Sequence, residues 1–113
     1  MVQTTSAVAL SDKVITRANI IAERTGSLEI GIVKAMMLEQ LEAKLAENQL
    51  CRIIFQKRDG SLREMFATTN PALCSRHING RGVSRELYKT TAVFDVESGS
   101  WKSFRWESLI QVF

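Results

Sequence analysis

The spacing of apolar residues along the chain changes from a helical period to an extended one near residue 50. Upstream, apolar side chains recur every three or four positions between Ser11 and Gly26, which places them on one face of a helix. These residues are Val14, Ala18, Ile21 and Ala22. Ser11 or Asp12 can cap the start of this first predicted helix, and Gly26 can end it.

A second predicted helix restarts at Ser27 and runs from about Leu28 to Asn48, because apolar residues again recur at spacings of three and four. They are Ile30, Val33, Met37, Leu41 and Leu45, with Glu39, Glu42, Lys44 and Glu47 on the other side. Met36 and Leu38 make this stripe wider than a two-stranded coiled coil needs. We therefore expect the helix to pack against several neighbours, within the subunit or between subunits of a homo-oligomer.

After Leu50, apolar and polar residues alternate, which is the period of a half-buried strand. Two pairs of alternating segments flank sequences typical of tight turns. The first pair, 51–57 and 62–68, flanks Arg58-Asp-Gly-Ser61, and the second, 91–96 and 101–106, flanks Glu97-Ser-Gly-Ser100. With a last short strand at 109–113, the pattern predicts five antiparallel strands.

Five short antiparallel strands bury their apolar face best by curling into a small open barrel, with the helices covering one mouth or edge. A chain of 113 residues has the size of a single folding unit. The predicted fold class is therefore α+β. A helical segment over residues 1–49 precedes a five-stranded antiparallel small barrel of the Sm or SH3 type over residues 50–113.

Basic residues are concentrated in the second half of the chain. Residues 1–49 carry five Lys or Arg against six Asp or Glu, whereas residues 50–113 carry ten against six. This asymmetry indicates an anionic partner. The alternative is a basic surface that only keeps the protein soluble.

The densest basic segment is a long loop predicted between Pro71 and Lys89. It contains Arg76, Arg81, Arg85 and Lys89 against Glu86, beside Gly80 and Gly82. Guanidinium groups and the backbone amides of a glycine-bearing loop can both bind a phosphate. A loop that is merely solvated is the alternative.

The segment from Trp101 to Trp106 carries an aromatic residue on each face of the predicted strand. If Phe104 and Trp106 fill the core, Trp101 and Arg105 lie on the opposite face. An aromatic ring with a guanidinium group suits a nucleobase and its phosphate. The alternative is that Trp101 only clamps the hairpin.

Arg52 and Arg63 belong to the paired strands of the first predicted hairpin. If their alternation matches, both project from the outer face of the sheet. Two like charges side by side are tolerated when water, a carboxylate such as Glu64 or Asp95, or a bound anion lies between them. A bound ligand is therefore one of three arrangements that would separate these charges.

The sequence offers little for catalysis or for metal binding. Cys51, Cys74 and His77 are its only thiols and its only imidazole, too few for a four-ligand zinc site without carboxylates. No phosphate loop, dinucleotide fingerprint or His-Glu-x-x-His motif occurs. We therefore expect two reduced thiols, no enzyme activity, no catalytic residue, no metal and no cofactor.

A cytoplasmic location is also expected. No apolar run approaches the roughly 18 residues that span a bilayer. The first ten residues lack the basic start of a secretion signal. We expect no membrane partner.

The second half of the chain resembles a phage-encoded family of Sm-like, SH3-type small-barrel domains related to the WYL group. The resemblance rests on Phe55-Gln-Lys-Arg-Asp-Gly60, Arg63-Glu-Met65, Ala67-Thr-Thr-Asn-Pro71, Val93-Phe-Asp-Val96 and Trp101-Lys-Ser-Phe-Arg-Trp-Glu-Ser-Leu-Ile110. It implies a fold and a phage setting for roughly the last 63 residues. Family members with helices ahead of such a sheet resemble anti-defence proteins, including oligomeric sponges for nucleotide alarm signals.

Three functions remain open on the sequence. The first is a non-enzymatic phage protein that sequesters a phosphate-bearing nucleotide at a basic-aromatic site. The second is a nucleic-acid binder or transcription modulator, and the third is an inhibitor of a host protein. For the first, the predicted ligand-binding residues are Arg105, Trp101, Arg81, Arg85, Arg63 and Arg52.

Overall fold

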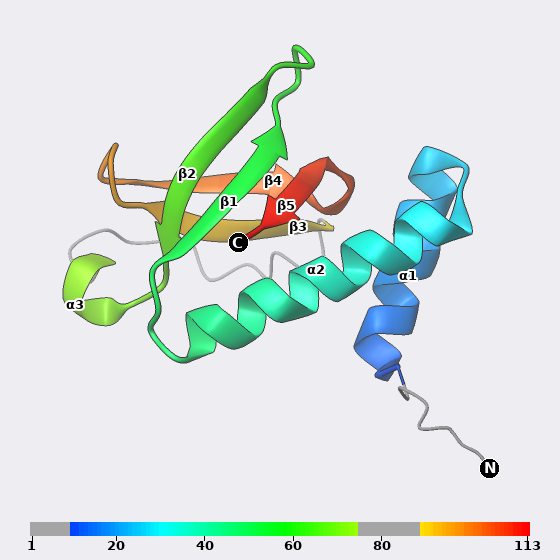
Figure 1. Cartoon of the computed structure of the whole chain (residues 1–113), viewed down its shortest axis with the longest axis horizontal. Coiled ribbons are helices and arrows are strands. Elements are labelled where there is room, and N and C mark those ends of the chain that lie inside the picture. Colours follow the sequence, from blue (N-terminus) through cyan, green and yellow to red (C-terminus); the bar gives the residue numbers. More distant parts are fainter. Residues whose placement is uncertain (1–9, 75–88) are drawn as a thin grey trace.

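The computed structural model describes residues 10–74 and 89–113. Two helices come first, and the remaining elements form or connect the sheet (Figure 1). In chain order these are α1 (Asp12–Thr25), α2 (Leu28–Ala46), β1 (Cys51–Gln56), β2 (Leu62–Thr68), α3 (Pro71–Cys74), β3 (Thr90–Asp95), β4 (Ser100–Arg105), the 3-10 helix η3 (Trp106–Ser108) and β5 (Leu109–Val112).

The helix boundaries follow from the capping residues. The Ser11 and Ser27 hydroxyls accept hydrogen bonds from backbone amides one turn into α1 and α2. Gly26 ends α1 in the left-handed region, with a φ of 78°, a conformation that glycine adopts without steric cost. The predicted helices are confirmed, although α2 ends at Ala46, two residues earlier than expected.

The strands form one antiparallel sheet in the order β4-β3-β2-β1-β5. The strands β4 and β5 lie at its two edges and are joined through η3, so the sheet curls without closing into a full barrel. Alternate residues of β1 point inward, with Cys51, Ile53 and Phe55 buried. The α+β fold with a five-stranded antiparallel sheet is therefore confirmed.

Two short helical turns lie where the sequence predicted other structure. The segment Pro71–Cys74 forms α3 at the start of the predicted loop, and Asn70 supports it by accepting an amide hydrogen bond from Ala72 through its side chain. Trp106 begins η3 and does not end the strand. Phe104 and Trp106 are both buried, as expected for the inward face.

The buried face of α2 differs from the predicted stripe in its N-terminal half. Ile30 and Val33 are exposed, whereas Gly31 and Ala35 are buried. A Cβ atom on Gly31 would lie 2.3 Å from the backbone oxygen of Ala18, so α1 crosses α2 in direct contact with this glycine. The small residues form the interface because they allow the two backbones to approach, which a count of large apolar residues does not detect.

One hydrophobic cluster joins the helices to the sheet. Val14 and Ile21 of α1, Leu41 of α2, Ile53 of β1 and Trp106 of η3 all belong to it. Figure 1 shows α2 running along the sheet while α1 crosses near the N-terminal end of α2. The helical segment therefore packs on the strands and does not stand apart from them.

A buried arginine lies in this junction. Arg17 is 2% exposed, and its two terminal nitrogens donate to both carboxylate oxygens of Glu42 at 3.0 and 2.7 Å. Its guanidinium carbon lies 4.9 Å from the centre of the Trp106 ring. Burial alone would raise the pKa of Glu42, but the hydrogen bonds and charge of Arg17, aided by Lys13, lower it below its usual value. We call Arg17, Glu42 and Trp106 the junction cluster.

Candidate functional site

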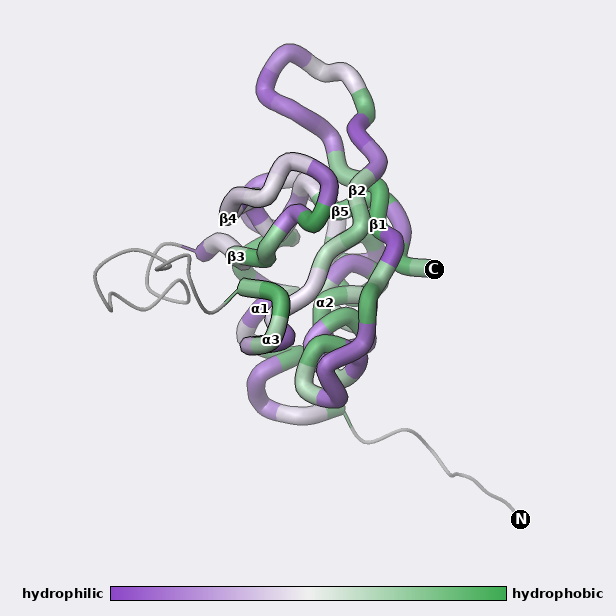
Figure 2. Tube along the Cα trace, turned by 90° about the vertical axis from the view of Figure 1, so that its left-hand side faces the viewer, coloured by the Kyte–Doolittle hydropathy of each residue, from purple (hydrophilic) through white to green (hydrophobic). Residues whose placement is uncertain are grey.

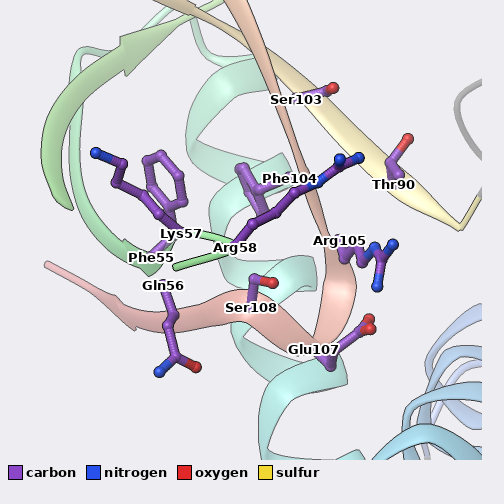
Figure 3. Close-up of a pocket in the computed structure, with 10 residues that line it drawn as sticks. All are labelled: Phe55, Gln56, Lys57, Arg58, Thr90, Ser103, Phe104, Arg105, Glu107 and Ser108. Carbon is purple, nitrogen blue, oxygen red and sulfur yellow. The ribbon is translucent and has the colours of Figure 1, made fainter. Parts of the chain in front are cut away.

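A pocket of about 460 Å³ opens where β1 leads into its turn and β4 leads into η3. Figure 3 shows the side chains around it. The pocket is lined by Phe55, Gln56, Lys57, Arg58, Thr90, Ser103, Phe104, Arg105, Glu107 and Ser108. It therefore combines a small apolar surface with several hydroxyl, amide and charged groups.

Two phenylalanines form the apolar part of the pocket. Phe55 comes from β1 and Phe104 from β4, and their ring centres lie 5.6 Å apart with the planes only 22° from parallel. Both residues are more than 90% buried. This stack joins the two strands across the curl of the sheet and gives the pocket a rigid apolar base.

The turn between β1 and β2 presents two of the cationic side chains. The amide of Gly60 donates to the carbonyl of Lys57 at 2.9 Å, and Gly60 has a φ of 89° that favours glycine. The carboxylate of Asp59 accepts hydrogen bonds from the hydroxyl and the amide of Ser61, which lower its pKa. Asp59 is thus held within its own turn and does not pair with Arg58.

This turn extends beyond the rest of the sheet. Figure 1 shows it at the tip of the β1–β2 hairpin, and Figure 2 shows the same tip as strongly hydrophilic. Lys57 and Arg58 are exposed there. The turn therefore holds positive charge at the edge of the pocket.

Three basic residues that line the pocket are exposed, namely Lys57, Arg58 and Arg105. Among the residues that the structure describes, none of their side chains forms a hydrogen bond or an ion pair. In Figure 3, Arg58 and Arg105 extend toward the same edge of the pocket. These three residues, which we call the pocket cations, leave donor groups available to an anion.

The acidic residue of the pocket is compensated from outside it. The Glu107 carboxylate accepts a hydrogen bond from Arg24 of α1 at 2.7 Å. Its backbone oxygen accepts another from Lys34 of α2 at 2.6 Å. Burial lowers the pKa of Lys34, and the charge of Glu107 partly opposes that effect. The pocket therefore keeps a positive character despite Glu107.

Among the predicted site residues, Arg105 lies in the pocket, whereas Trp101 does not. Trp101 stands at the other end of β4, four residues or about 13 Å along an extended strand. Its ring packs edge-on against Phe94 of β3, with ring centres 5.8 Å apart. The structure does not bring Trp101 and Arg105 together, and it places Trp101 where it clamps the β3–β4 hairpin.

Arg52 and Arg63 do not project together, because the alternation of the two strands does not match in the way that a shared face required. Arg52 pairs across the ladder with Phe66, and Arg63 pairs with Phe55. Arg63 thus lies opposite a β1 position that is three residues from Arg52. Because this separation is odd, the two side chains lie on opposite faces of the sheet.

Each of these two arginines already has a carboxylate partner. Arg52 bonds to Glu64 and also lies over the ring of Phe113, 4.2 Å from its centre. Arg63 pairs with the buried carboxylate of Asp95 at 2.9 Å. The carboxylates named in the sequence argument are thus the ones that compensate these arginines, and neither arginine lines the pocket.

The remaining predicted site residues, Arg81 and Arg85, lie outside the described residues, as do Arg76 and His77. Cys51 and Cys74 are both free and buried, and burial raises the pKa of the Cys51 thiol. Within residues 10–74 and 89–113, no group of three or more His, Cys, Asp or Glu could hold a metal ion. The absence of enzyme activity stays a prediction.

Sequence reasoning missed Lys57 and Arg58 as site residues. Lys57 ends the first predicted strand and Arg58 begins the predicted turn, and two successive cations before Asp-Gly place positive charge at a hairpin tip. The pairing of Glu107 with Arg24 joins residues 83 positions apart. No local pattern could have indicated that contact.

The described part of the chain has no helix long and apolar enough to cross a membrane.

Comparison with known proteins gives a family and a phage relative. The sequence model of a family described as WYL_2, Sm-like SH3 beta-barrel fold, matches residues 38–110, a range that includes nearly all of α2's C-terminal half and every pocket residue. A protein of Enterobacteria phage T4, the uncharacterized 11.5 kDa protein in the Gp31-cd intergenic region, is 30% identical over 82 residues, covering 70% of this chain and 79% of that protein. No solved structure is significantly similar to the chain.

Proposed function

The chain belongs to the WYL_2 family of the Sm-like SH3 β-barrel fold, and from that premise we propose that it is a non-enzymatic phage accessory protein that sequesters a phosphate-bearing nucleotide. The ligand, in this proposal a host defence signal, binds in the pocket between the β1–β2 turn and the end of β4. The relative from phage T4 supports the phage setting of the proposal.

The observation that carries the proposal is the set of pocket cations, whose side chains form no ion pair or hydrogen bond within residues 10–74 and 89–113. Arg58 and Arg105 each present a planar fork of donors, which matches the oxygens of a phosphate group. Lys57 adds a third positive charge to the pocket lining, and in Figure 3 it extends to the opposite side from Arg58 and Arg105. Such a concentration of positive charge in a concave site attracts an anion and speeds its capture.

The rest of the pocket suits the nucleoside part of such a ligand. A volume of about 460 Å³ lies within the range of roughly 300–1,000 Å³ of small-molecule sites. The Phe55 and Phe104 pair gives an apolar wall, while Gln56, Ser103 and Ser108 supply polar groups that can hydrogen-bond a base or a sugar. A purely inorganic anion would use only the rim of this pocket.

A second candidate function is binding of single-stranded nucleic acid. The β1–β2 turn projects beyond the sheet with Lys57 and Arg58 exposed (Figure 1), so a strand running along it could place successive phosphates near the turn. Small barrels bind single strands through basic grooves of this kind. Binding of an oligonucleotide depends steeply on salt because several counterions are released together.

We also propose that the protein is a homo-oligomer joined partly through α2. Ile30, Val33 and Met36 are between 42% and 58% exposed on this helix. Ile30 and Val33 also border a shallow groove, together with Met37 and Ile110. Light scattering should give a mass above one subunit at micromolar concentration. A mass of one subunit there would contradict this part of the proposal.

Purification followed by native mass spectrometry tests the function directly. Protein from cells that make phage-defence signals should carry a nucleotide-sized adduct, whereas a nucleic-acid binder should carry heterogeneous material that high salt removes. Calorimetric titration with ATP and with a short oligothymidylate, each at two salt concentrations, then ranks the two classes of ligand.

Substitutions connect the binding to the pocket. Arg105→Ala and Arg58→Ala should each weaken ATP binding about ten- to a hundredfold, since a charge-assisted hydrogen bond contributes about 1.5–3 kcal/mol. The matched control is Arg52→Ala, which removes the same charge from an arginine outside the pocket. If both pocket variants melt normally and bind ATP as tightly as the control, the site is elsewhere.

A further inference from the structure

Glu107 is an anion inside a pocket that we assign to anions. It lines the pocket two residues after Arg105, on the short stretch where β4 passes into η3. A carboxylate tethered so close to the pocket cations is an internal competitor for any phosphate, because its effective concentration far exceeds that of a free ligand. The protein must therefore hold this carboxylate away from Arg105 if the pocket is to bind an external anion.

Arg24 is positioned to do this. Its Nη1 atom lies 2.7 Å from Oε1 of Glu107, and the same nitrogen donates to the backbone oxygen of Lys89 at 3.4 Å. The Arg24 side chain is 33% exposed and that of Glu107 is 21% exposed, so the pair is partly shielded from water and less screened than a pair at the surface. In Figure 3 the Glu107 carboxylate lies on the side of the pocket that faces the helices.

A second helix fixes the backbone that carries Glu107. Lys34 of α2 donates to the backbone oxygen of Glu107 at 2.6 Å. The two helices thus hold one residue by two different groups, the side chain through α1 and the main chain through α2. The short η3 segment between Arg105 and β5 is therefore oriented by the helices as well as by the sheet.

From this geometry we propose that Arg24 is a positioning residue for the anion pocket: it holds the Glu107 carboxylate outward and so keeps Arg105 available to the ligand. The inference rests on the proposed function, since it concerns the same pocket. It assigns the helical pair a role in binding, although neither helix contributes a side chain to the pocket lining. Without Arg24, the Glu107 carboxylate turns toward the pocket cations and competes with the phosphate.

The test is a double-mutant cycle with ATP as the probe at low salt. Arg24→Ala should weaken ATP binding about tenfold, equivalent to roughly 1.4 kcal/mol. Glu107→Gln alone should change the affinity less than about fivefold, because the carboxylate is already neutralised by Arg24. The double variant Arg24→Ala with Glu107→Gln should regain nearly the wild-type affinity, since the competing charge is gone.

Two further variants separate positioning from other effects. Arg24→Lys keeps a cation that can still pair with Glu107 and should bind ATP nearly as well as the wild type. Lys13→Ala removes a different α1 cation, one that pairs with Glu42 and lies outside this pocket, and it controls for the loss of one positive charge from α1. Melting curves on all variants establish that each is folded at the titration temperature.

Each outcome decides the inference. Recovery of binding in the double variant supports it, because a merely structural role for Arg24 would leave the double variant as weak as Arg24→Ala or weaker. Wild-type affinity in Arg24→Ala, or no recovery in the double variant, overturns it while leaving the pocket assignment intact. If the wild-type protein binds neither ATP nor the oligothymidylate, the proposed function fails, and this inference fails with it.

Discussion

Positive charge is buried and paired in the junction cluster, whereas the pocket cations are exposed. In the junction cluster, Arg17 is buried, both of its terminal nitrogens bond to Glu42, and the Trp106 ring lies against it. The pocket cations are exposed and border a concave surface, and their side chains form no ion pair or hydrogen bond among the described residues. The two environments adjoin along the chain, since Arg105 directly precedes Trp106, the first residue of η3.

The difference follows from the cost of burying charge. An ion removed from water without a partner costs several kcal/mol, so a buried arginine must be paired to be tolerated. An exposed cation carries no such cost and can remain unpaired until a ligand arrives. We therefore expect substitutions in the junction cluster to change the free energy of unfolding, and substitutions of the pocket cations to change affinity.

The largest expected effect is at Trp106. This residue is fully buried, and its indole N–H has no hydrogen-bond partner in the described part of the chain, so it acts through packing and its contact with Arg17. Trp106→Ala should lower the free energy of unfolding by about 3–5 kcal/mol, as measured by urea denaturation.

Trp101→Ala is the matched control for that substitution. Trp101 is only half-buried and packs against Phe94, so its loss should cost markedly less. Equal losses for the two tryptophans would mean that the helix–sheet junction is no more important than the β3–β4 hairpin clamp.

The next effect is at the crossing of the two helices. Gly31→Ala should lower the free energy of unfolding by about 3 kcal/mol, the upper end of the range for overpacking, because the new methyl group meets the backbone oxygen of Ala18. Alanine is otherwise the better helix former by about 1 kcal/mol. A stability equal to or above that of the wild type in thermal melts would show that the helices separate at little cost.

Glu42→Gln should have a somewhat smaller effect, of about 1–3 kcal/mol, because it removes a carboxylate that accepts two charge-assisted hydrogen bonds from Arg17. Glu23→Gln is the control, since Glu23 is an exposed carboxylate on α1. Denaturant titrations at neutral pH should separate the two variants. Matching stabilities would mean that the Arg17–Glu42 pair contributes nothing net.

The lowered pKa of the Glu42 carboxylate predicts that the protein loses folding stability in acid. The pKa of Glu42 in the folded protein is lowered from its ordinary value of 4.5, so its contribution is complete above that pH and is lost as the pH falls through the folded-state pKa. Wild-type stability should therefore decline below about pH 4.5 more steeply than that of Glu42→Gln. Parallel pH profiles for the two proteins would rule out this linkage.

The smallest expected effect on stability is at the pocket cations. Arg58→Ala and Arg105→Ala should each change the free energy of unfolding by less than about 0.5 kcal/mol, as is usual for exposed side chains without partners. Thermal melts of the same samples used for ATP titration provide this measurement. A loss comparable to that of Glu42→Gln would mean that these arginines are structural, and the contrast between the two clusters would not hold.

The candidate site could be predicted from the sequence only in part. Arg105 was identified because the pattern placed Phe104 and Trp106 inward and Arg105 outward, and the structure places all three as expected. Trp101 lies on the same strand but too far from Arg105 to share a ligand, since a strand advances about 3.3 Å per residue. Arg52 and Arg63 were misplaced because the register of the β1–β2 ladder, and not the spacing within either strand, decides which face each one occupies.

By itself, the sequence determined the elements of this protein, because helix caps, apolar periods and the Asp59-Gly60 turn act over a few neighbouring residues. Ser11, Gly26 and Ser27 limit the helices where expected, and five strands form within a residue or two of their predicted positions. Only the tertiary structure decided which charges are compensated. The contacts of Arg17 with Glu42 and of Arg24 with Glu107 span 25 and 83 residues. Such contacts depend on how α1 and α2 pack against η3, and packing of that kind leaves no periodic trace along the chain.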